Sequence, residues 1–232
     1  MNVIVPLAGP DFVGFDGSVK ALIPFEGDPL LWHILKSRPW AEAVGRYTFV
    51  LKDTAETRTF AKEYLSKWLP GSTHIFMTTF TRGAACSALA GVACQTDNHQ
   101  PLIVDLADIL YVSDLDVMTR LSLSPRCGGL ALSFNSSSPL YSYLHCDERG
   151  KVIEAAEKRV ISTHASAGTY IFRNSAIYLH ALAHAFSNEA SQAFNNLFYV
   201  CPLFNGVLTQ GLDVELEAVH NVIDIKMRSD SE

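Results

Sequence analysis

The sequence opens with VIVPLAGP at residues 3–10, and the rest of the chain follows the plan that this stretch sets. Five apolar residues before a Gly-Pro turn are typical of a strand buried on both faces, as in a parallel sheet. A loop with two glycines comes next, and KALIPFEGDPLL at residues 20–31 then leads from Lys20 into a helix expected over residues 29–36. This order suits a nucleotide site, because loop N–H groups and a helix N-terminus attract phosphates. An ordinary strand-to-helix connection explains the same pattern, so both interpretations stay open.

Outward from this stretch, strands and helices alternate through the first 110 residues. The predicted strands lie at residues 3–7, 46–51, 73–77, 101–108, 128–134, 141–145, 151–154, 165–172 and 214–219, and the predicted helices at 29–36, 53–68, 81–94, 174–185 and 206–209. Such alternation is typical of a parallel sheet with helices on both faces, whereas residues 125–225 are richer in strands and more mixed. We therefore predict the α/β class, with a Rossmann-like, mostly parallel mixed sheet in a single domain over residues 1–232.

The composition is typical of a compact globular protein. The chain has 232 residues, of which 48% are hydrophobic and 18% charged, enough for one α/β domain with a sizeable core. It has no apolar run long enough to span a membrane and no basic secretory leader, so we expect a cytoplasmic protein. The net charge of −6 and the lack of a basic stripe argue against nucleic-acid binding. The oligomeric state stays open, and a homo-oligomer is compatible with the sequence.

The cysteines and histidines do not predict a metal centre. No two of the five cysteines form a C-x-x-C pair, which favours reduced thiols over zinc ligands or disulfides. His180 and His184 lie four residues apart on a predicted helix, but the glutamate of the H-E-x-x-H motif is missing. We therefore expect these two histidines to be exposed or to cap the helix.

The predicted helix over residues 81–94 consists mainly of small residues and begins at Gly83. The chain enters this helix through Gly83, and the N–H groups there lack partners within the helix, which makes them candidate donors to a ligand. Small residues also let a helix pack closely against a sheet. The sequence favours the two explanations about equally.

The predicted strand over residues 101–108 has carboxylates at its C-terminal end, where ligands of α/β sheets bind. Asp105 and Asp108 are expected to be exposed there, and Asp108 is a candidate Mg²⁺ ligand because Mg²⁺ prefers carboxylates together with substrate phosphates. A helix cap or a turn is the alternative explanation for Asp108. Asp114 and Asp116 lie further on and are expected to cap or solvate a loop.

Four stretches together indicate a family. They are KALIPFEGDPL at residues 20–30, EKRVIS at 157–162, ASAGTYIF at 165–172 and FYVCPLFN at 198–205. They resemble the sugar-phosphate nucleotidylyltransferases, and the capsule-biosynthesis branch most closely. This family has the GT-A-like fold of the nucleotide-diphospho-sugar transferases. Its members join a nucleoside triphosphate to a sugar phosphate or similar phosphomonoester and release pyrophosphate.

The resemblance covers residues 3–225 and implies a nucleotide-binding half at residues 1–125 and an acceptor half at 126–232. Its implied nucleotide contacts are Ala8, Gly9 and Gly83, and its implied catalytic residues are Lys20 and Asp108. Its implied acceptor contacts are Glu157, Lys158 and Gly168, although Glu157 and Lys158 also suit a surface charge cluster and Gly168 a β-bulge. Its implied Mg²⁺ ligands are Asp108 and Asp224, whose carboxylates should lie close together. The likeness to the capsule branch favours CTP or UTP as the nucleotide.

The loop after the first strand departs from the family. Members carry Gly-x-Gly-Thr/Ser-Arg there, and the arginine holds the triphosphate, but residues 9–13 read GPDFV. The loop instead carries Asp11 and Asp16, which should repel phosphate. Arg82, on the facing loop, is the candidate replacement. Two further departures are Leu197, in place of a glutamate, and KMR at residues 226–228, in place of Gly-Thr-Pro.

Two functions of different classes therefore remain. The first is a Mg²⁺-dependent nucleotidylyltransferase in the synthesis of surface-polysaccharide precursors. The second is a catalytically degenerate relative that binds a sugar nucleotide or acts as a regulatory subunit. A GT-A glycosyltransferase is a weaker third interpretation, because Asp105 and Asp108 do not form the D-x-D motif of those enzymes.

Overall fold

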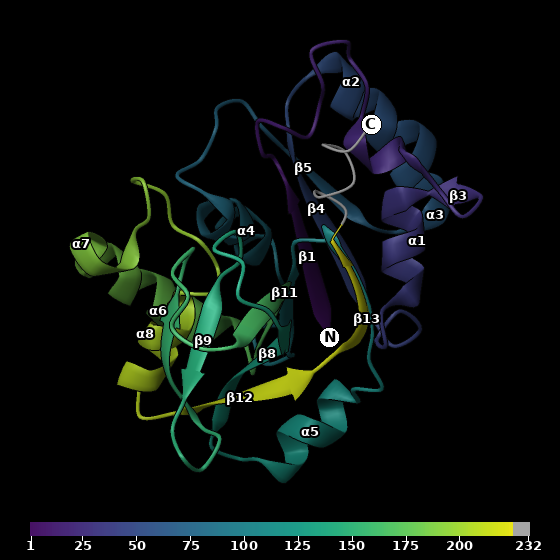
Figure 1. The fold of residues 1–232 in the computed structure, drawn as a ribbon. Coiled ribbons are helices and arrows are strands. Elements are labelled where there is room, and N and C mark those ends of the chain that lie inside the picture. Colours follow the sequence, from purple (N-terminus) through teal and green to yellow (C-terminus); the bar gives the residue numbers. More distant parts are fainter. Residues whose placement is uncertain (225–232) are drawn as a thin grey trace.

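A computed structural model of the protein describes residues 1–224, with helices on both faces of a central sheet (Figure 1). The described part of this sheet has nine strands in the order β10-β9-β11-β6-β1-β4-β5, with β8 beside β11 and β12 beside β8. They are β1 (Asn2–Leu7), β4 (Arg46–Lys52), β5 (Thr73–Met77), β6 (Leu102–Asp105), β8 (Cys127–Asn135), β9 (Tyr143–Cys146), β10 (Val152–Ala156), β11 (His164–Phe172) and β12 (Asp213–Ala218). The predicted α/β class and mostly parallel mixed sheet are confirmed.

The first half of the chain builds the parallel part of the sheet. β1 pairs in parallel with β4 on one side and with β6 on the other, and β4 pairs in parallel with β5. Parallel strands carry their C-terminal ends to the same edge of the sheet. The segments that follow β1 and β6 therefore lie near each other, although about 95 residues separate them in the sequence.

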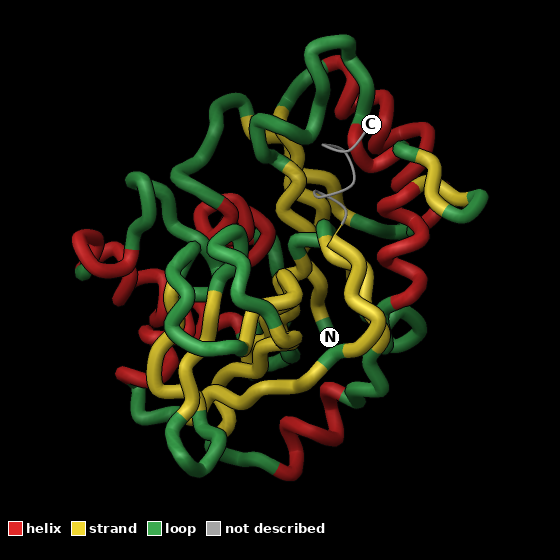
Figure 2. Tube along the Cα trace, in the orientation of Figure 1, coloured by secondary structure: helices red, strands yellow, loops and turns green. Residues whose placement is uncertain are grey.

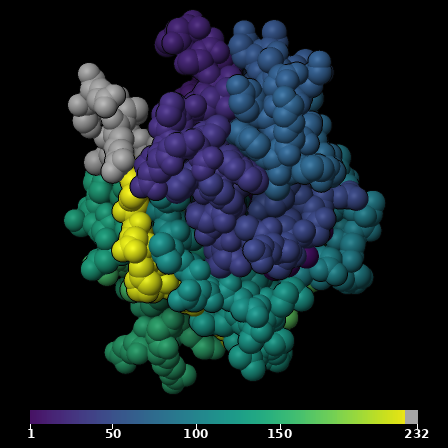
Figure 3. Space-filling view, turned by 90° about the vertical axis from the view of Figure 1, so that its right-hand side faces the viewer, coloured from purple at the N-terminus to yellow at the C-terminus, as the bar shows by residue number. Residues whose placement is uncertain are grey.

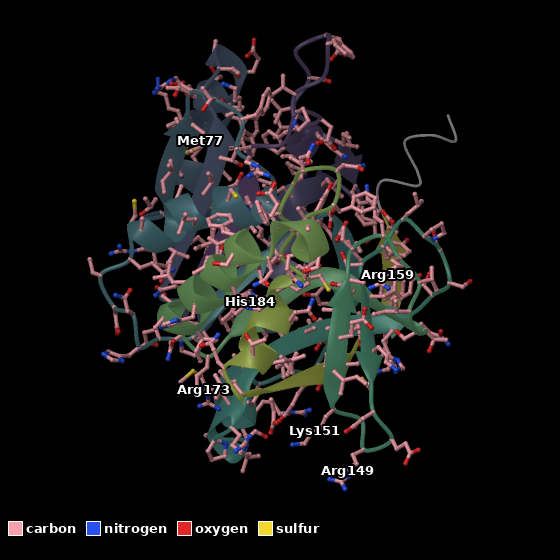
Figure 4. All side chains as sticks on the ribbon, turned by 90° about the vertical axis from the view of Figure 1, so that its left-hand side faces the viewer. Met77, Arg149, Lys151, Arg159, Arg173 and His184 are labelled. Carbon is pink, nitrogen blue, oxygen red and sulfur yellow. The ribbon has the colours of Figure 1, made fainter. Side chains whose placement is uncertain are left out.

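The second half adds the mixed part, as the sequence predicted. β11 runs antiparallel to β6, β8 and β9, and β12 pairs in parallel with β8. The predicted hairpin is formed by β9 and β10, and Arg149 and Lys151 lie at its tip (Figure 4). The pairing of β11 with β6 joins the two halves, because it places the segment around Gly168 beside the end of β6.

The helices follow capping signals in the sequence. Thr54 forms a capping box with Thr57 at the start of α2, and the side chains of Asp116 and Asn174 cap α5 and α6. The helices are α1 (Leu30–Ser37), α2 (Ala55–Phe60), α3 (Ser66–Trp68), α4 (Ala84–Ala93), α5 (Val117–Leu123), α6 (Ser175–Ser187), α7 (Glu189–Gln192) and α8 (Leu203–Thr209), with a 3₁₀ turn η1 (Lys20–Leu22) and a π turn η2 (Ala61–Leu65). Over residues 1–224, no helix is both long and apolar enough to cross a membrane.

The core has two layers, one on each face of the sheet. Alternate residues of β1 point to opposite faces, so Val3 and Val5 pack with α1 and α2 while Ile4 packs with α4, α6 and α8. Figure 2 shows the same arrangement, with red helices on either side of the yellow strands. Burial on both faces explains why β1 reads as a continuous apolar run.

Two small sheets lie outside the main one. β2 (Pro24–Phe25) pairs with β3 (Asp28–Pro29), and β7 (Ile109–Val112) pairs antiparallel with β13 (His220–Asp224). In Figure 3, β13 is the yellow strip on the surface beside teal chain. The sequence did not predict β7 or β13. It predicted that the strand at residues 101–108 ends three residues beyond the actual end of β6. The segment at residues 226–228 lies outside the described residues.

Candidate active site

A pocket of about 600 Å³ lies at the sheet edge where β1 and β6 end. Its wall combines the loop after β1, the start of α1, the start of α4, the turn after β6, and two residues from the segment before α8. The predicted site residues in this wall are Ala8, Gly9, Lys20, Gly83 and Asp108. The fold therefore gathers five of the ten predicted residues from three distant parts of the sequence into one pocket.

The wall carries little positive charge. Its charged residues in the described chain are Asp11, Lys20 and Asp108, and most other wall residues are apolar. The ammonium of Lys20 lies 3.4 Å from Oδ2 of Asp11, whose side chain is 69% exposed. Exposed pairs of this kind contribute little free energy, so a phosphate can compete with Asp11 for Lys20. An apolar wall with a few polar groups is typical of a small-molecule site.

The loop between β1 and η1 folds back against the core. Phe12 is buried and packs edge-on against Phe60, with ring centroids 5.8 Å apart. The N–H of Lys20 donates to the carbonyl of Phe12 at 3.0 Å, and Val13 forms a β-bridge with Val19. These contacts hold both Asp11 and Lys20 at the pocket.

The start of α4 is built around Gly83, which has a positive φ of 101°. A Cβ atom at this position would clash with the backbone of Phe198, which crosses directly over it. The N–H of Ala85 donates to the carbonyl of Phe198 at 3.1 Å. Close backbone packing therefore explains this glycine, and one of the predicted candidate donors is engaged within the protein.

Two hydroxyl groups beside Gly83 belong to the pocket wall and were missed by the sequence analysis. Thr81 Oγ1 lies 2.6 Å from Ser87 Oγ, and both residues line the pocket. Ser87 lies four residues after Gly83, on the same face of α4, so the helical period was the available signal.

Arg82 does not line the pocket, contrary to the role expected for it. Its guanidinium is paired with Glu189, lies over the ring of Phe198 with a centroid distance of 4.9 Å, and donates to the carbonyl of Asn196. This arrangement leaves Lys20 as the basic side chain in the described part of the wall.

The turn after β6 presents Asp108 to the pocket. Ala107 adopts the left-handed conformation with a φ of 52°, and its N–H donates to Oδ1 of Asp105 at 2.9 Å. The N–H of Leu106 donates to the carbonyl of Gly168 on β11. The turn that carries Asp108 is therefore held by the last residue of β6 and by β11.

Asp105 is fully buried, so the expectation that it is exposed is wrong. Its carboxylate accepts two hydrogen bonds from Arg38, one from Nε at 2.7 Å and one from Nη2 at 2.9 Å, and both side chains are 0% exposed. Arg38 also lies over the ring of Tyr111, 4.1 Å from its centroid. A buried carboxylate needs such a partner, and here it comes from the end of α1.

Asp224 approaches Asp108 through the pairing of β13 with β7. Its partner in the antiparallel register is Ile109, the residue after Asp108. The hydroxyl of Tyr141 donates to Oδ2 of Asp224 at 2.7 Å. Burial, together with the charges of Asp224 and Asp108, raises the pKa of Tyr141 above its usual value. Tyr141 is therefore close enough to both carboxylates to be affected by their charges, and the close approach of Asp108 to Asp224 stays a prediction.

This donor set fits Mg²⁺ that is shared with a substrate. Within residues 1–224, no group of three His, Cys, Asp or Glu side chains is arranged to hold a metal ion. Mg²⁺ is commonly bound by one or two carboxylates plus substrate phosphates, so Asp108 and Asp224 suffice when phosphate supplies the remaining oxygens. The residues present are therefore compatible with the predicted ion.

Glu157 and Lys158 lie next to the pocket but outside its wall. The hydroxyl of Ser142 donates to the carboxylate of Glu157. The ammonium of Lys158 lies 5.8 Å from the ring centroid of Phe194 and 5.9 Å from that of Tyr199. Tyr199 also lines the pocket, so Lys158 is one aromatic contact away from the pocket wall.

Gly168 lies in a bulge of β11, where the register with β8 shifts between Ser166 and Tyr170. The residue is buried, and its φ is 75°. Its N–H donates to Ser166 Oγ at 3.1 Å, and its carbonyl accepts from Leu106. A Cβ atom here would lie 2.9 Å from Oδ1 of Asp108. The bulge that the sequence left open as an alternative is present.

The cysteines and histidines take no part in this site. All five cysteines are free, and burial raises the pKa of Cys127 to about 11, so this thiol stays protonated at neutral pH. His184 lies on α6 and is within hydrogen-bonding distance of Asn188 at the helix C-terminus (Figure 4). The position of His184 at the helix C-terminus agrees with the sequence-based expectation.

Solved structures share this fold over the whole chain. A nucleoside-diphosphate-sugar pyrophosphorylase from Vibrio cholerae is 23% identical with a TM-score of 0.81, and the match covers 99% of this chain and 98% of that one. A UDP-glucose pyrophosphorylase in complex with UDP-glucose is 17% identical with a TM-score of 0.69, over 97% and 92% of the two chains. The inositol-1-phosphate CTP transferase from T. maritima is 12% identical with a TM-score of 0.64, over 96% and 86%. No protein-family model and no curated protein matches the chain. At these identities, the likeness establishes a common fold.

Proposed function

We propose that this protein is a nucleotidylyltransferase that joins a nucleoside triphosphate to a sugar phosphate or a similar phosphomonoester. The observation that carries the proposal is the pocket, in which Lys20, Gly83 and Asp108 come together from three separate segments. The fold shared with nucleotidylyltransferases supports it. The resemblance to the capsule branch further suggests CTP or UTP, a cytoplasmic location and a role in making surface-polysaccharide precursors.

In this reaction, an oxygen of the acceptor phosphate attacks the α-phosphorus of the triphosphate. A new P–O–P bond forms, the bond between the α- and β-phosphates breaks, and pyrophosphate leaves with the electron pair. Such catalysis depends mainly on positioning and on neutralising charge. Lys20 gives up its ion pair with Asp11 and binds a phosphate oxygen instead. The loop at Ala8 and Gly9 and the helix start at Gly83 surround the nucleoside. Mg²⁺ held by Asp108 and Asp224 would neutralise phosphate charge.

The acceptor binds on the far side of Tyr199. Lys158 binds the acceptor phosphate. Its contacts with two aromatic rings are weak enough to be replaced by an ion pair with that phosphate. Glu157, held by Ser142, offers a carboxylate to acceptor hydroxyls. This division places the nucleotide in the apolar pocket and the acceptor beside it.

One observation favours the second candidate, a binding or regulatory subunit. A triphosphate brings roughly four negative charges, whereas the charged wall residues are two aspartates and one lysine. A nucleotide sugar carries fewer charges and tolerates this wall better. The two candidates differ in one respect that can be measured, which is the release of pyrophosphate.

A thermal-shift titration with ATP, CTP, GTP and UTP, each with and without Mg²⁺, tests the nucleotide site. A ligand at 100 times its Kd adds about 2.7 kcal/mol, which raises the Tm of a chain this long by roughly 5–10 °C. We expect such a shift with CTP or UTP, larger with Mg²⁺, followed by pyrophosphate release with a panel of phosphomonoesters. No shift with any triphosphate, but a shift with nucleotide sugars, would support the binding subunit instead.

Replacing Asp11 with asparagine should strengthen nucleotide binding. The substitution frees Lys20 from a pair of about 0.2–1 kcal/mol and removes a like charge whose repulsion is about 1 kcal/mol at 4 Å in water. We therefore expect the Kd for the nucleotide to fall about eightfold to thirtyfold, measured by calorimetry at low salt.

Asp16→Asn is the matched control for Asp11→Asn. Asp16 lies in the same loop and accepts from the N–H of Ser18, but it does not line the pocket. The Asp16→Asn substitution should leave the Kd for the nucleotide within about twofold of the wild-type value. Equal effects of the two substitutions would mean that net charge, rather than competition for Lys20, limits binding.

A further inference from the structure

Gly168 and Asp108 lie in direct apposition across the pairing of β11 with β6. A Cβ atom at Gly168 would come within 2.9 Å of Oδ1 of Asp108, closer than real Cβ atoms come to their neighbours. We infer that Gly168 is a positioning residue, whose missing side chain leaves the space in which the Asp108 carboxylate is held for the metal. This role replaces the acceptor contact that the resemblance implies, and it rests on the proposed function for the assignment of Asp108 as a ligand.

The backbone of Gly168 is already engaged within the protein. Its N–H donates to Ser166 Oγ, and its carbonyl accepts from the N–H of Leu106. The residue is buried and does not line the pocket. An acceptor that bonded the N–H of Gly168 would have to displace Ser166 Oγ, and the buried hydroxyl left unpaired would cost free energy.

The backbone of the turn that carries Asp108 is held in place by hydrogen bonds. The turn that carries Asp108 is fixed by Leu106, which is bonded to Gly168, and by Ala107, whose N–H donates to the buried Asp105. The same Cβ atom at Gly168 would also lie 3.6 Å from Cβ of Leu106, at ordinary contact distance. The Asp108 carboxylate is therefore the group that must move when a methyl group is added.

Such a movement matters for a metal ligand. Mg²⁺ demands near-ideal geometry, with oxygens about 2.0–2.1 Å away. Changes in the groups that orient metal ligands typically weaken metal binding about 10–100-fold. A methyl group at Gly168 should thus weaken metal binding without touching the metal.

The first test uses Tb³⁺ alone, with excitation of the protein's tyrosines, because a trivalent ion is attracted to two carboxylates more strongly than Mg²⁺ and so does not need substrate phosphate to bind there. Tyr141 is hydrogen-bonded to Asp224, so Tb³⁺ at this site should give sensitised emission that Mg²⁺ displaces and that Asp108→Asn removes. We expect Gly168→Ala to raise the half-saturating Tb³⁺ concentration about tenfold or more. An unchanged half-saturation, or a wild-type protein without this emission, would overturn the inference.

Gly150→Ala is the matched control. Gly150 has a similar φ of 77°, but a Cβ atom there would meet nothing within 4 Å. It lies between Arg149 and Lys151 at the hairpin tip (Figure 4), so it reports the cost of a methyl group at positive φ alone. Both substitutions should lower Tm by a few degrees, and Gly150→Ala should leave Tb³⁺ binding within about twofold.

A double variant keeps the test decisive when Gly168→Ala folds poorly. Asp108→Ala removes the carboxylate that the new methyl group meets, so Gly168→Ala should lower Tm less in the Asp108→Ala background than in the wild type. An equal loss in both backgrounds would assign the glycine to backbone conformation only and overturn the inference.

Pyrophosphate release by the wild-type protein is measured in parallel. If no triphosphate and acceptor react, but Tb³⁺ distinguishes Gly168→Ala from Gly150→Ala, the proposed function fails and the positioning role stands. If pyrophosphate is released and Tb³⁺ binding is unchanged while the KM for the acceptor rises, the positioning role fails and the acceptor contact is correct.

Discussion

Replacing Asp108 with asparagine is expected to lower the rate of pyrophosphate release about 10²–10⁴-fold. Asp108 reaches the pocket from the end of β6, beside the β13 residue Asp224. An amide has one oxygen and no charge, so it binds Mg²⁺ weakly and leaves phosphate charge uncompensated. Metal ions contribute several kcal/mol to such reactions, and each 1.36 kcal/mol is a factor of ten in rate.

The effect should be kinetic rather than structural. The residues that hold the turn, Asp105 and Ala107, are unchanged in this variant, so Tm should stay within a few degrees of the wild-type value. Asp114→Asn is the control, because Asp114 is an exposed aspartate a few residues further on that does not line the pocket. Retention of more than about a tenth of the activity by Asp108→Asn would rule out Asp108 as a metal ligand.

The residues that the sequence placed in the pocket follow from local rules. Gly9 lies in the loop after β1, Asp108 in the turn after β6, and Gly83 just before α4, and parallel strands carry such positions to one edge of the sheet. The same rules explain the errors. A strand ending in two carboxylates does not reveal which one turns inward, so Asp105 was expected at the surface, although it is buried.

The contacts that position the site come from pairs far apart in the sequence. Arg38 and Asp105 are 67 residues apart, and Tyr141 and Asp224 are 83 apart. Neither pair has a local sequence pattern, because Arg38 follows α1 and Tyr141 precedes β9, and only the tertiary fold brings them to their partners. Arg82 is the converse case, since it pairs with Glu189, 107 residues away, and does not line the pocket.

The Arg38–Asp105 pair leads to the second large effect, which is on stability. Replacing Arg38 with methionine leaves the carboxylate of Asp105 buried without its cation, and losing one partner of a buried pair typically costs about 3–5 kcal/mol. For a chain of this length, Tm should fall by roughly 6–20 °C. The free energy of unfolding, measured in urea, checks the magnitude.

Arg58→Met is the matched control, because Arg58 makes the same two-pronged contact with Asp53, at 2.6 and 2.9 Å, on the surface. Water stabilises the partner that remains there, so the loss should be a small fraction of that for Arg38→Met. The double variant Arg38→Met/Asp105→Asn removes both buried charges and keeps an oxygen acceptor for the N–H of Ala107. It should be more stable than Arg38→Met alone, because the unpaired charge is what makes the single substitution costly. A double variant as unstable as the sum of the two single variants would instead assign the loss to packing of Arg38 against Tyr111.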